Sequence, residues 1–236
     1  MAKKFALLLF FLTFFTRLPA RDKDAVRFPE HREEIKALLS KVSDAQEALK
    51  TLRVKFVQTN RFKMLNKPQV LKGTMTIEKP DTVLYKYDSP SRLYFLVKDG
   101  NLLIYDPSEK KVVIQDIRRH QSRIIRYLGV TRPFDELAES FDVKWLSKEK
   151  DLVHLELYPK KFRLKRKIAV MHFWINEKTL MLKAFEIVQK DGDSTRFEFL
   201  DWDRNPRLPK DAFKVDIPEG IKVQRHLWGL GETLKH

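Results

Sequence analysis

From residue 53 onwards, much of the chain alternates apolar and polar residues in short segments that end at turn residues. In residues 73–90 (GTMTIEKPDTVLYKYDSP), Met75 and Ile77 alternate with polar residues, and Val83 and Tyr85 resume the alternation after the Lys-Pro-Asp break. A period of two places every second side chain on the same face of a strand, and proline with aspartate favours a turn. The pattern therefore predicts a β-hairpin with one apolar face, which either packs on a core or lines a cavity.

Further short segments, most of them alternating but two of them (residues 93–97 and 102–105) apolar on both faces, bring the predicted number of strands to about eleven. Gly100 and Pro107 lie in strong turn signals between three of the segments. Short strands at close spacing favour an antiparallel meander in one sheet large enough to curl. The expected strands are residues 53–63, 74–78, 83–87, 93–97, 102–105, 112–117, 143–146, 153–158, 168–175, 181–189, 196–202, and 213–217 with 221–223.

Helical spacing occurs in three places, so about three helices are expected to cover the sheet. The first follows Pro29, with apolar residues from Ile35 to Leu52 at intervals of three and four. Two short helices interrupt the meander, and their apolar residues are Ile124, Ile125 and Leu128 in one and Phe134, Leu137, Ala138 and Phe141 in the other. Because the apolar strand faces exceed what three short helices can seal, we expect a partly unfilled interior, as in small open barrels that hold apolar ligands.

The first twenty residues have the parts of a secretory signal: Lys3 and Lys4, an apolar run over residues 5–15, and Ala20 near the cleavage position. The apolar run is shorter than the ~20 residues that span a bilayer. We therefore expect export to the periplasm with cleavage near Ala20, and the alternative is a retained N-terminal anchor. Residues 21–236 are expected to form a single domain, since β-rich domains of ~200–250 residues are common.

The chain has no cysteine, so an exported fold depends on its core and not on disulfides. Removing Lys3, Lys4 and Arg17 lowers the formal net charge from +15 to +12. In the periplasm such a charge favours anionic lipid or acidic proteins and not nucleic acid. The run KKFRLKRK, which begins at Lys160 and ends at Lys167, is either a solvated hairpin loop or a docking contact to anionic lipid or to an acidic protein face.

The sequence contains no pattern typical of catalysis or of a bound cofactor. It has no Gly-x-Ser-x-Gly elbow, no phosphate-binding glycine loop and no His-Glu-x-x-His motif. The six histidines, among them His154 and His172, lack the spacing of metal ligands. Asp191-Gly192-Asp193 is interpreted as a hairpin turn, because a calcium loop would need a glutamate where Trp202 stands. We expect a protein that is not an enzyme and has no cofactor and no metal.

Several segments, in order, resemble the periplasmic outer-membrane lipoprotein carriers of the LolA type. The similar segments are Phe56-Val57-Gln58-Thr59, Gly73-Thr74-Met75-Thr76-Ile77, Glu78-Lys79-Pro80, Tyr85-Lys86-Tyr87, Ser89-Pro90, Asp99-Gly100 with Leu102-Leu103-Ile104-Tyr105-Asp106-Pro107, Asp191-Gly192-Asp193-Ser194-Thr195-Arg196-Phe197, Asn205, and residues 213–220 (FKVDIPEG). The resemblance extends from about Leu38 to Val223, and residues 224–236 lack a matching segment.

This resemblance implies an incomplete, unclosed antiparallel β-barrel of about eleven strands under a helical lid. It also implies a monomer that binds lipoprotein acyl chains and shuttles them from the inner to the outer membrane. The implied partners are a lipoprotein-releasing ABC transporter of the inner membrane and an acceptor at the outer membrane. Residues expected to line the lipid-binding cavity are Phe56, Met75, Ile77, Val83, Tyr85, Leu93, Phe95, Leu103 and Tyr105.

The lid is expected to include Ile124, Ile125, Leu128, Phe134, Leu137 and Phe141. At the family's Lys-Arg-Pro turn, arginine is thought to hold the lid closed through hydrogen bonds to backbone carbonyls, and this chain has Lys79 there. Lysine keeps the positive charge but donates its hydrogen bonds from a single ammonium group, so we expect it to hold the lid closed less firmly than arginine does.

Two other functions remain open at this level. Related folds serve as periplasmic modules that sense lipids or lipoproteins and signal through a membrane partner, and the cargo of a carrier can also be another amphiphile such as a glycolipid. An exported hydrolase is disfavoured by the missing motifs.

Overall fold

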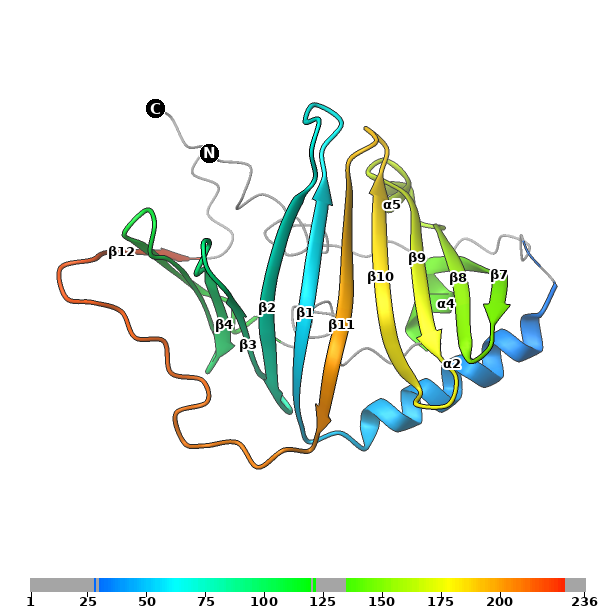
Figure 1. Cartoon of the computed structure of the whole chain (residues 1–236), viewed down its shortest axis with the longest axis horizontal. Helices are drawn as coiled ribbons and strands as arrows, with labels where there is room; N and C mark the ends of the chain where they lie inside the picture. Colours follow the sequence, from blue (N-terminus) through cyan, green and yellow to red (C-terminus); the bar gives the residue numbers. More distant parts are fainter. Residues whose placement is uncertain (1–27, 29, 120, 122–134, 228–236) are drawn as a thin grey trace. The chain divides into compact units, whose positions relative to one another are not determined.

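The computed structural model describes residues 28, 30–119, 121 and 135–227. Over this part of the chain the protein is mainly β, and its strands form one sheet in the order β12-β6-β5-β4-β3-β2-β1-β11-β10-β9-β8-β7 (Figure 1). The order has two ends, so the described sheet is open. The strands are β1 (Thr51–Arg61), β2 (Gln69–Glu78), β3 (Thr82–Tyr87), β4 (Tyr94–Lys98), β5 (Asn101–Asp106), β6 (Lys111–Asp116), β7 (Phe141–Glu149), β8 (Leu152–Pro159), β9 (Ile168–Asn176), β10 (Met181–Gln189), β11 (Ser194–Arg204) and β12 (Lys222–Leu227).

The predicted open, mainly β sheet is confirmed, with two corrections near the C-terminus. Residues 213–217 form no strand, because the prolines at 206, 209 and 218 around them remove backbone donors that a sheet needs. The last strand is β12 instead, and it pairs in parallel with β6, with Lys222 opposite Lys111. The neighbouring pairs from β2 to β6 and from β7 to β11 are antiparallel, as predicted.

The described helices are α2 (Arg32–Glu47), α4 (Asp135–Ser140) and the single turn α5 (Phe162–Lys165). The N-terminal helix is confirmed by α2, although it ends at Glu47 and Leu52 lies in β1. The second insert helix corresponds to α4, although Phe141 begins β7. The expected helix at Ile124, Ile125 and Leu128 lies outside the described residues, so a lid of about three helices is not confirmed. At α5 the structure places a helical turn where sequence analysis allowed a loop. None of the described helices has the length and apolar character that a membrane span requires.

The chain divides into two compact units, each built from three segments: residues 1–48, 57–70 and 126–200 in unit 1, and residues 49–56, 71–125 and 201–236 in unit 2. In unit 1, α2 buries Ile35, Leu38, Leu39 and Val42 on one side. The His31 ring before α2 lies 5.5 Å from the ring of Trp145, whose register partner is the buried Leu155. The helix therefore begins on the same face of β7 and β8 that forms the buried core of this unit.

Unit 2 contains β2 from Leu71 onwards, strands β3 to β6 and β12, the first part of β1 and the end of β11. Its two distant segments are joined at Asn205, whose Oδ1 accepts hydrogen bonds from the backbone of Lys50 at 2.7 Å and of Thr51 at 3.3 Å. The Asn205 backbone N–H donates to the Thr51 carbonyl at 2.9 Å. These bonds hold the segment after β11 beside the start of β1, and the candidate site lies on the strands that follow.

Candidate functional site

One face of unit 2 carries most of the residues predicted to contact a ligand. Strand register aligns Met75 with Tyr85, Tyr85 with Phe95 and Phe95 with Ile104 in a row across β2, β3, β4 and β5. A parallel row joins Ile77, Val83, Val97 and Leu102. With Phe56 and Tyr87 these residues define what we call the Tyr85 face: Phe56, Met75, Ile77, Val83, Tyr85, Tyr87, Phe95, Val97, Leu102 and Ile104.

The Tyr85 face is covered in this structure. Its side chains range from 0% exposed at Met75 to 6% exposed at Tyr85. A ligand can therefore reach these residues only if their cover moves. Leu93, also predicted for the cavity, precedes β4 and is 8% exposed, and its carbonyl accepts a hydrogen bond from Tyr87 N–H at 2.8 Å.

Four aromatic rings form the centre of the Tyr85 face. The Phe56 ring centroid lies 5.8 Å from Tyr85 and 5.2 Å from Tyr87, and the Tyr87 ring lies 6.0 Å from Phe95, all edge to face. Burial raises the pKa of Tyr85, and burial together with the neighbouring Tyr85 raises the pKa of Tyr87, both far above the usual range. The two phenols thus stay neutral, and the face presents rings without charge.

Gly73 makes room for this aromatic cluster. It is the register partner of Tyr87 on β2, and a Cβ atom at Gly73 would lie 2.7 Å from Cζ of Phe56 and closer still to the Lys86 carbonyl oxygen. A side chain at this position would displace the Phe56 ring. The glycine noted in the sequence therefore has a packing role.

Two predicted cavity residues lie on the other side of the strands. Leu103 pairs with Leu96, and Tyr105 pairs with Tyr94 and stacks on its ring at 5.8 Å. Their positions in β5 alternate with those of Leu102 and Ile104, so they do not share a face with Phe95. The continuous apolar run of β5 gave no alternation from which to assign its faces, and the register with β4 supplies that assignment.

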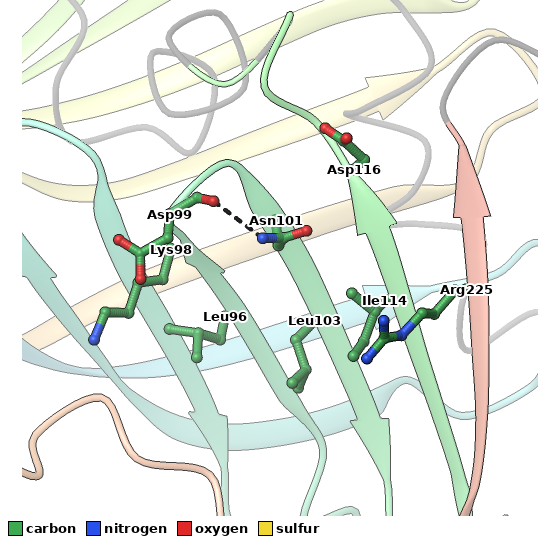
Figure 2. Close-up of a pocket in the computed structure, with 8 residues that line it drawn as sticks. All are labelled: Leu96, Lys98, Asp99, Asn101, Leu103, Ile114, Asp116 and Arg225. Carbon is green, nitrogen blue, oxygen red and sulfur yellow. Dashed lines mark hydrogen bonds between the residues drawn. The ribbon is translucent and has the colours of Figure 1, made fainter.

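Leu103 lines a pocket of about 480 Å³ instead (Figure 2). Leu96, Leu103 and Ile114 are register neighbours and form its apolar floor, and Arg225 of β12 is the register partner of Ile114. Lys98, Asp99, Asn101 and Asp116 complete the lining. Arg225 was not predicted from the sequence, because residues 224–236 have no recognisable pattern.

Asp116, at the edge of this pocket, is paired with Arg118. Arg118 donates hydrogen bonds to both carboxylate oxygens of Asp116, and these bonds lower the pKa of Asp116 to about 2. The Asn101 amide donates to the Asp99 carbonyl at 3.0 Å, as Figure 2 shows. The pocket is thus an apolar strip with a polar rim, on the opposite face from the aromatic cluster.

The turn after β2 carries Lys79, the predicted latch. Lys79 is half-buried, and its backbone N–H donates to the Lys50 carbonyl at 2.9 Å. Two residues later, the Asp81 carbonyl accepts a hydrogen bond from Gln121 Nε2 at 3.3 Å. Gln121 stands three residues before Ile124, the first residue predicted for the lid.

The other predicted lid residues are only partly described. Leu137 in α4 is 6% exposed and Phe141 at the start of β7 is 4% exposed. Ile124, Ile125, Leu128 and Phe134 lie outside the described residues. Tyr87, Val97 and Ile104 were absent from the predicted set of cavity residues, although Tyr87 and Val97 follow Tyr85 and Phe95 at a spacing of two, which was the available signal.

The structure brings together two histidines that the sequence left apart. His154 Nε2 lies 3.1 Å from His172 Nδ1 on β8 and β9, and Glu156 Oε1 lies 3.8 Å from the same His172 atom. Within the described residues no group of three or more histidine, aspartate or glutamate side chains has the arrangement of a metal site.

Comparison with known proteins gave one family and a set of relatives. The family model described as "Outer membrane lipoprotein carrier protein LolA" matches residues 47–216. An outer-membrane lipoprotein carrier protein of Nitrosospira multiformis is 24% identical over 226 residues, which cover 94% of this chain and 98% of that protein. One of the same description from Dechloromonas aromatica is 23% identical over 186 residues, covering 78% of this chain and 86% of that protein.

Among solved structures, an uncharacterized conserved protein from Thermus thermophilus is similar in fold. Its TM-score is 0.53 at 10% identity, and the match covers 82% of this chain and 99% of that chain. At this level of identity the likeness concerns the fold alone.

Proposed function

Because this chain belongs to the LolA family of outer membrane lipoprotein carrier proteins, we propose that it binds lipoprotein acyl chains on the Tyr85 face. The observation that carries the proposal is the extent of the family match, since residues 47–216 contain every residue of that face. The proposed task is to shuttle lipoproteins through the periplasm from the inner to the outer membrane, without catalysing a reaction.

The chemistry of the Tyr85 face suits an acyl chain. Removing one methylene from water is worth about 0.8 kcal/mol, so a chain of ~16 carbons gains on the order of 12 kcal/mol from an apolar site. An acylated protein therefore needs a carrier to cross an aqueous compartment. Uncharged aromatic and aliphatic side chains offer such a site, with Phe56, Leu93 and Phe95 among the proposed contacts.

Loading requires the face to be uncovered. We assign the cover to a lid that includes Ile124, Ile125, Leu128, Phe134, Leu137 and Phe141, and the latch to Lys79. The contact from Gln121 to the Asp81 carbonyl supports this assignment, because Gln121 stands three residues before Ile124, the first proposed lid residue. The lid would open at a lipoprotein-releasing ABC transporter of the inner membrane and again at an acceptor of the outer membrane.

Photo-crosslinking in a Gram-negative periplasm tests the binding face. Phe95→p-benzoylphenylalanine places the photoreactive group on the Tyr85 face, and Tyr94→p-benzoylphenylalanine, one residue away on the opposite face, is the matched control. We expect cross-links from position 95 to acylated proteins, identified by mass spectrometry, and none from position 94. Cross-links from position 94 alone, or none to any acylated protein in a folded and exported variant, would refute the proposal. A glycolipid as the only product would make the chain a carrier of another amphiphile.

The latch is tested separately. In Lys79→Gln the positive charge is lost and the lid should open more readily, which increases the labelling of position 95 and lowers the retention of cargo. Lys79→Arg restores a planar fork of donors and should tighten retention beyond that of the unmodified chain. Equal cargo retention in all three proteins would remove Lys79 from the mechanism while leaving the binding face untouched.

A further inference from the structure

Four large apolar side chains of unit 1 are exposed at the ends of neighbouring segments. Met64 is 83% exposed and Leu65 57% exposed in the loop between β1 and β2, and Val70 at the start of β2 is 52% exposed. Phe162, the first residue of α5, is 74% exposed. Exposed apolar groups gathered in this way mark an interaction surface more often than single scattered ones do.

Hydrogen bonds place these segments at the same end of the unit (Figure 1). The backbone N–H of Lys63, beside Met64, donates to Asp193 Oδ1 at 2.8 Å in the turn between β10 and β11. At the other side of that turn, Lys190 N–H donates to the Lys167 carbonyl at 2.9 Å, just after α5. We call the three segments together, residues 61–70, 160–167 and 190–193, the loop face.

The α5 turn holds Phe162 outward in a defined position. Leu164 is 3% exposed and anchors the turn, while the backbone N–H groups of Leu164 and Lys165 both donate to the Lys161 carbonyl at 2.9 Å. The Arg166 N–H donates to the Phe162 carbonyl at 3.1 Å. One aliphatic residue thus faces the core and one aromatic residue faces solvent in the same turn, which core packing does not explain.

The loop face is strongly basic. Its three segments contain ten lysine and arginine residues and two acidic residues, Asp191 and Asp193. Asp193 already accepts the Lys63 backbone hydrogen bond. Each of the three segments therefore contributes at least one cationic residue.

We propose that the loop face docks on an anionic lipid bilayer, with Met64, Leu65 and Phe162 entering the interfacial region and the lysine and arginine side chains contacting lipid phosphates. Apolar side chains flanked by cations are what a membrane surface binds, because the acyl boundary accepts the tips and the negative surface potential attracts the charges. Met64 and Leu65 stand on one segment and Phe162 on another. A deformable lipid surface accommodates this arrangement better than a rigid acidic protein would.

This proposal goes beyond the carrier function and does not rest on it. It identifies the part of the molecule that would meet a membrane, whatever the cargo. A chain that binds vesicles through the loop face but gives no cross-link from position 95 would refute the carrier function alone, and the reverse result would refute only the docking surface.

The absence of cysteine allows a local test in the full-length chain. Met64→Cys carries an environment-sensitive fluorophore on the loop face, and Leu146→Cys, at a 43% exposed leucine of β7, carries the same label as the matched control. Vesicles of equal parts phosphatidylglycerol and phosphatidylcholine are compared with vesicles of phosphatidylcholine alone. We expect a blue shift at position 64 on the anionic vesicles only, and no shift at position 146.

Two further variants separate the apolar and ionic contributions. Phe162→Ser in the labelled chain should weaken vesicle binding by at least about tenfold, the loss expected when one buried aromatic contact is removed. Neutralising Lys165, Arg166 and Lys190 to Gln should abolish the preference for anionic lipid, whereas neutralising Lys148, Lys150 and Lys178, at the opposite end of the unit, should leave it unchanged. A silent label at position 64 in a chain with native circular dichroism, an equal effect of the two triple variants, or a shift with soluble polyglutamate but not with vesicles would overturn the proposal.

Discussion

The Phe56 ring lies against Gly73 so closely that a Cβ atom at Gly73 would be 2.7 Å from Cζ of Phe56. The same atom would press on the Lys86 carbonyl oxygen, which belongs to the backbone of the paired strand and cannot rotate away. The aromatic cluster of the Tyr85 face thus depends on the absence of a side chain on β2. This dependence leads to the first prediction.

Gly73→Ala should lower the free energy of unfolding by about 1–3 kcal/mol, the usual cost of overpacking a well-filled core. Urea denaturation followed by circular dichroism measures the change. Thr74→Ala, at the next residue and on the opposite face, is the control and should cost less than about 1 kcal/mol. A Gly73→Ala protein as stable as the unmodified chain would mean that Phe56 can move at little cost.

The His154 and His172 pair predicts a dependence of stability on pH. The pKa of His154 is lowered first by burial and then by the positive charges of His172 and Arg196, against the opposing charge of Glu156. The unfolded chain therefore binds a proton at this residue more readily than the native chain does, and stability falls as the proton concentration rises. The contribution is complete above the ordinary value of 6.5 and declines as the pH drops from 6.5 toward the lowered pKa.

Unfolding in urea at a series of pH values between about 5 and 7.5 measures this slope. His154→Gln should flatten it, because the group that takes up the proton on unfolding is gone. NMR titration of the His154 ring provides an independent reading of the lowered pKa. An unchanged slope in His154→Gln would assign the pH dependence to other groups.

Asn60 is the centre of a buried polar network in unit 1. Its Oδ1 accepts hydrogen bonds from Gln58 Nε2 at 2.9 Å and from Thr195 Oγ1 at 3.0 Å, and its Nδ2 donates to Gln69 Oε1 at 3.2 Å. Asn60→Ala deprives three neighbours of this partner at once. We expect the free energy of unfolding to fall by about 2–3 kcal/mol, because buried polar groups that lose a partner keep their desolvation cost.

Urea unfolding tests this expectation. Asn66→Ala, at an exposed asparagine of the loop between β1 and β2, is the matched control and should change stability by less than about 0.5 kcal/mol. Equal effects of the two substitutions would show that water replaces the lost hydrogen bonds.

Strand β12 is expected to protect the edge of β6. Ending the chain after Gly220 removes β12, and the β6 amides that pair with it should then exchange with solvent faster. Hydrogen exchange read by mass spectrometry measures the loss over residues 111–116. A chain that ends after Leu227 keeps β12 and should retain full protection, so a loss in that control would attribute the effect to residues 228–236.

Several elements could be predicted from local patterns, because the spacing of their apolar residues shows which side of the element is buried. The alternation in residues 73–87 identified the hairpin of β2 and β3 and the apolar face of both strands. The helical spacing from Ile35 to Val42 likewise identified α2, whose buried residues include Ile35, Leu38, Leu39 and Val42. In both cases the period of the pattern is the period of the element, so no knowledge of distant residues was needed.

Other elements depended on neighbouring strands that local sequence patterns do not identify. The run from Leu102 to Tyr105 is apolar at each position, so its faces were decided by register with β4, which turned Leu103 and Tyr105 away from Phe95. Residues 222–227 have little periodicity and became β12 only because the edge of β6 was available for parallel pairing. The exposure of Phe162 could likewise not be predicted from its position in a run of charged residues, because exposure depends on how the chain folds around the side chain.

The amino-acid sequence by itself determined the class of the protein: a mainly β chain with a basic surface, an apolar strand face and the ordered motifs of a carrier family. These features follow from residue types and short spacings, which act over a few residues along the chain. Only the tertiary structure decided which side chains share a face, that Gly73 makes room for Phe56, that His154 meets His172, and that Met64 and Phe162 lie at one end of their unit. Each of these depends on strand register and on hydrogen bonds between segments far apart in sequence. Such contacts stabilise the protein only after folding has brought the distant groups together.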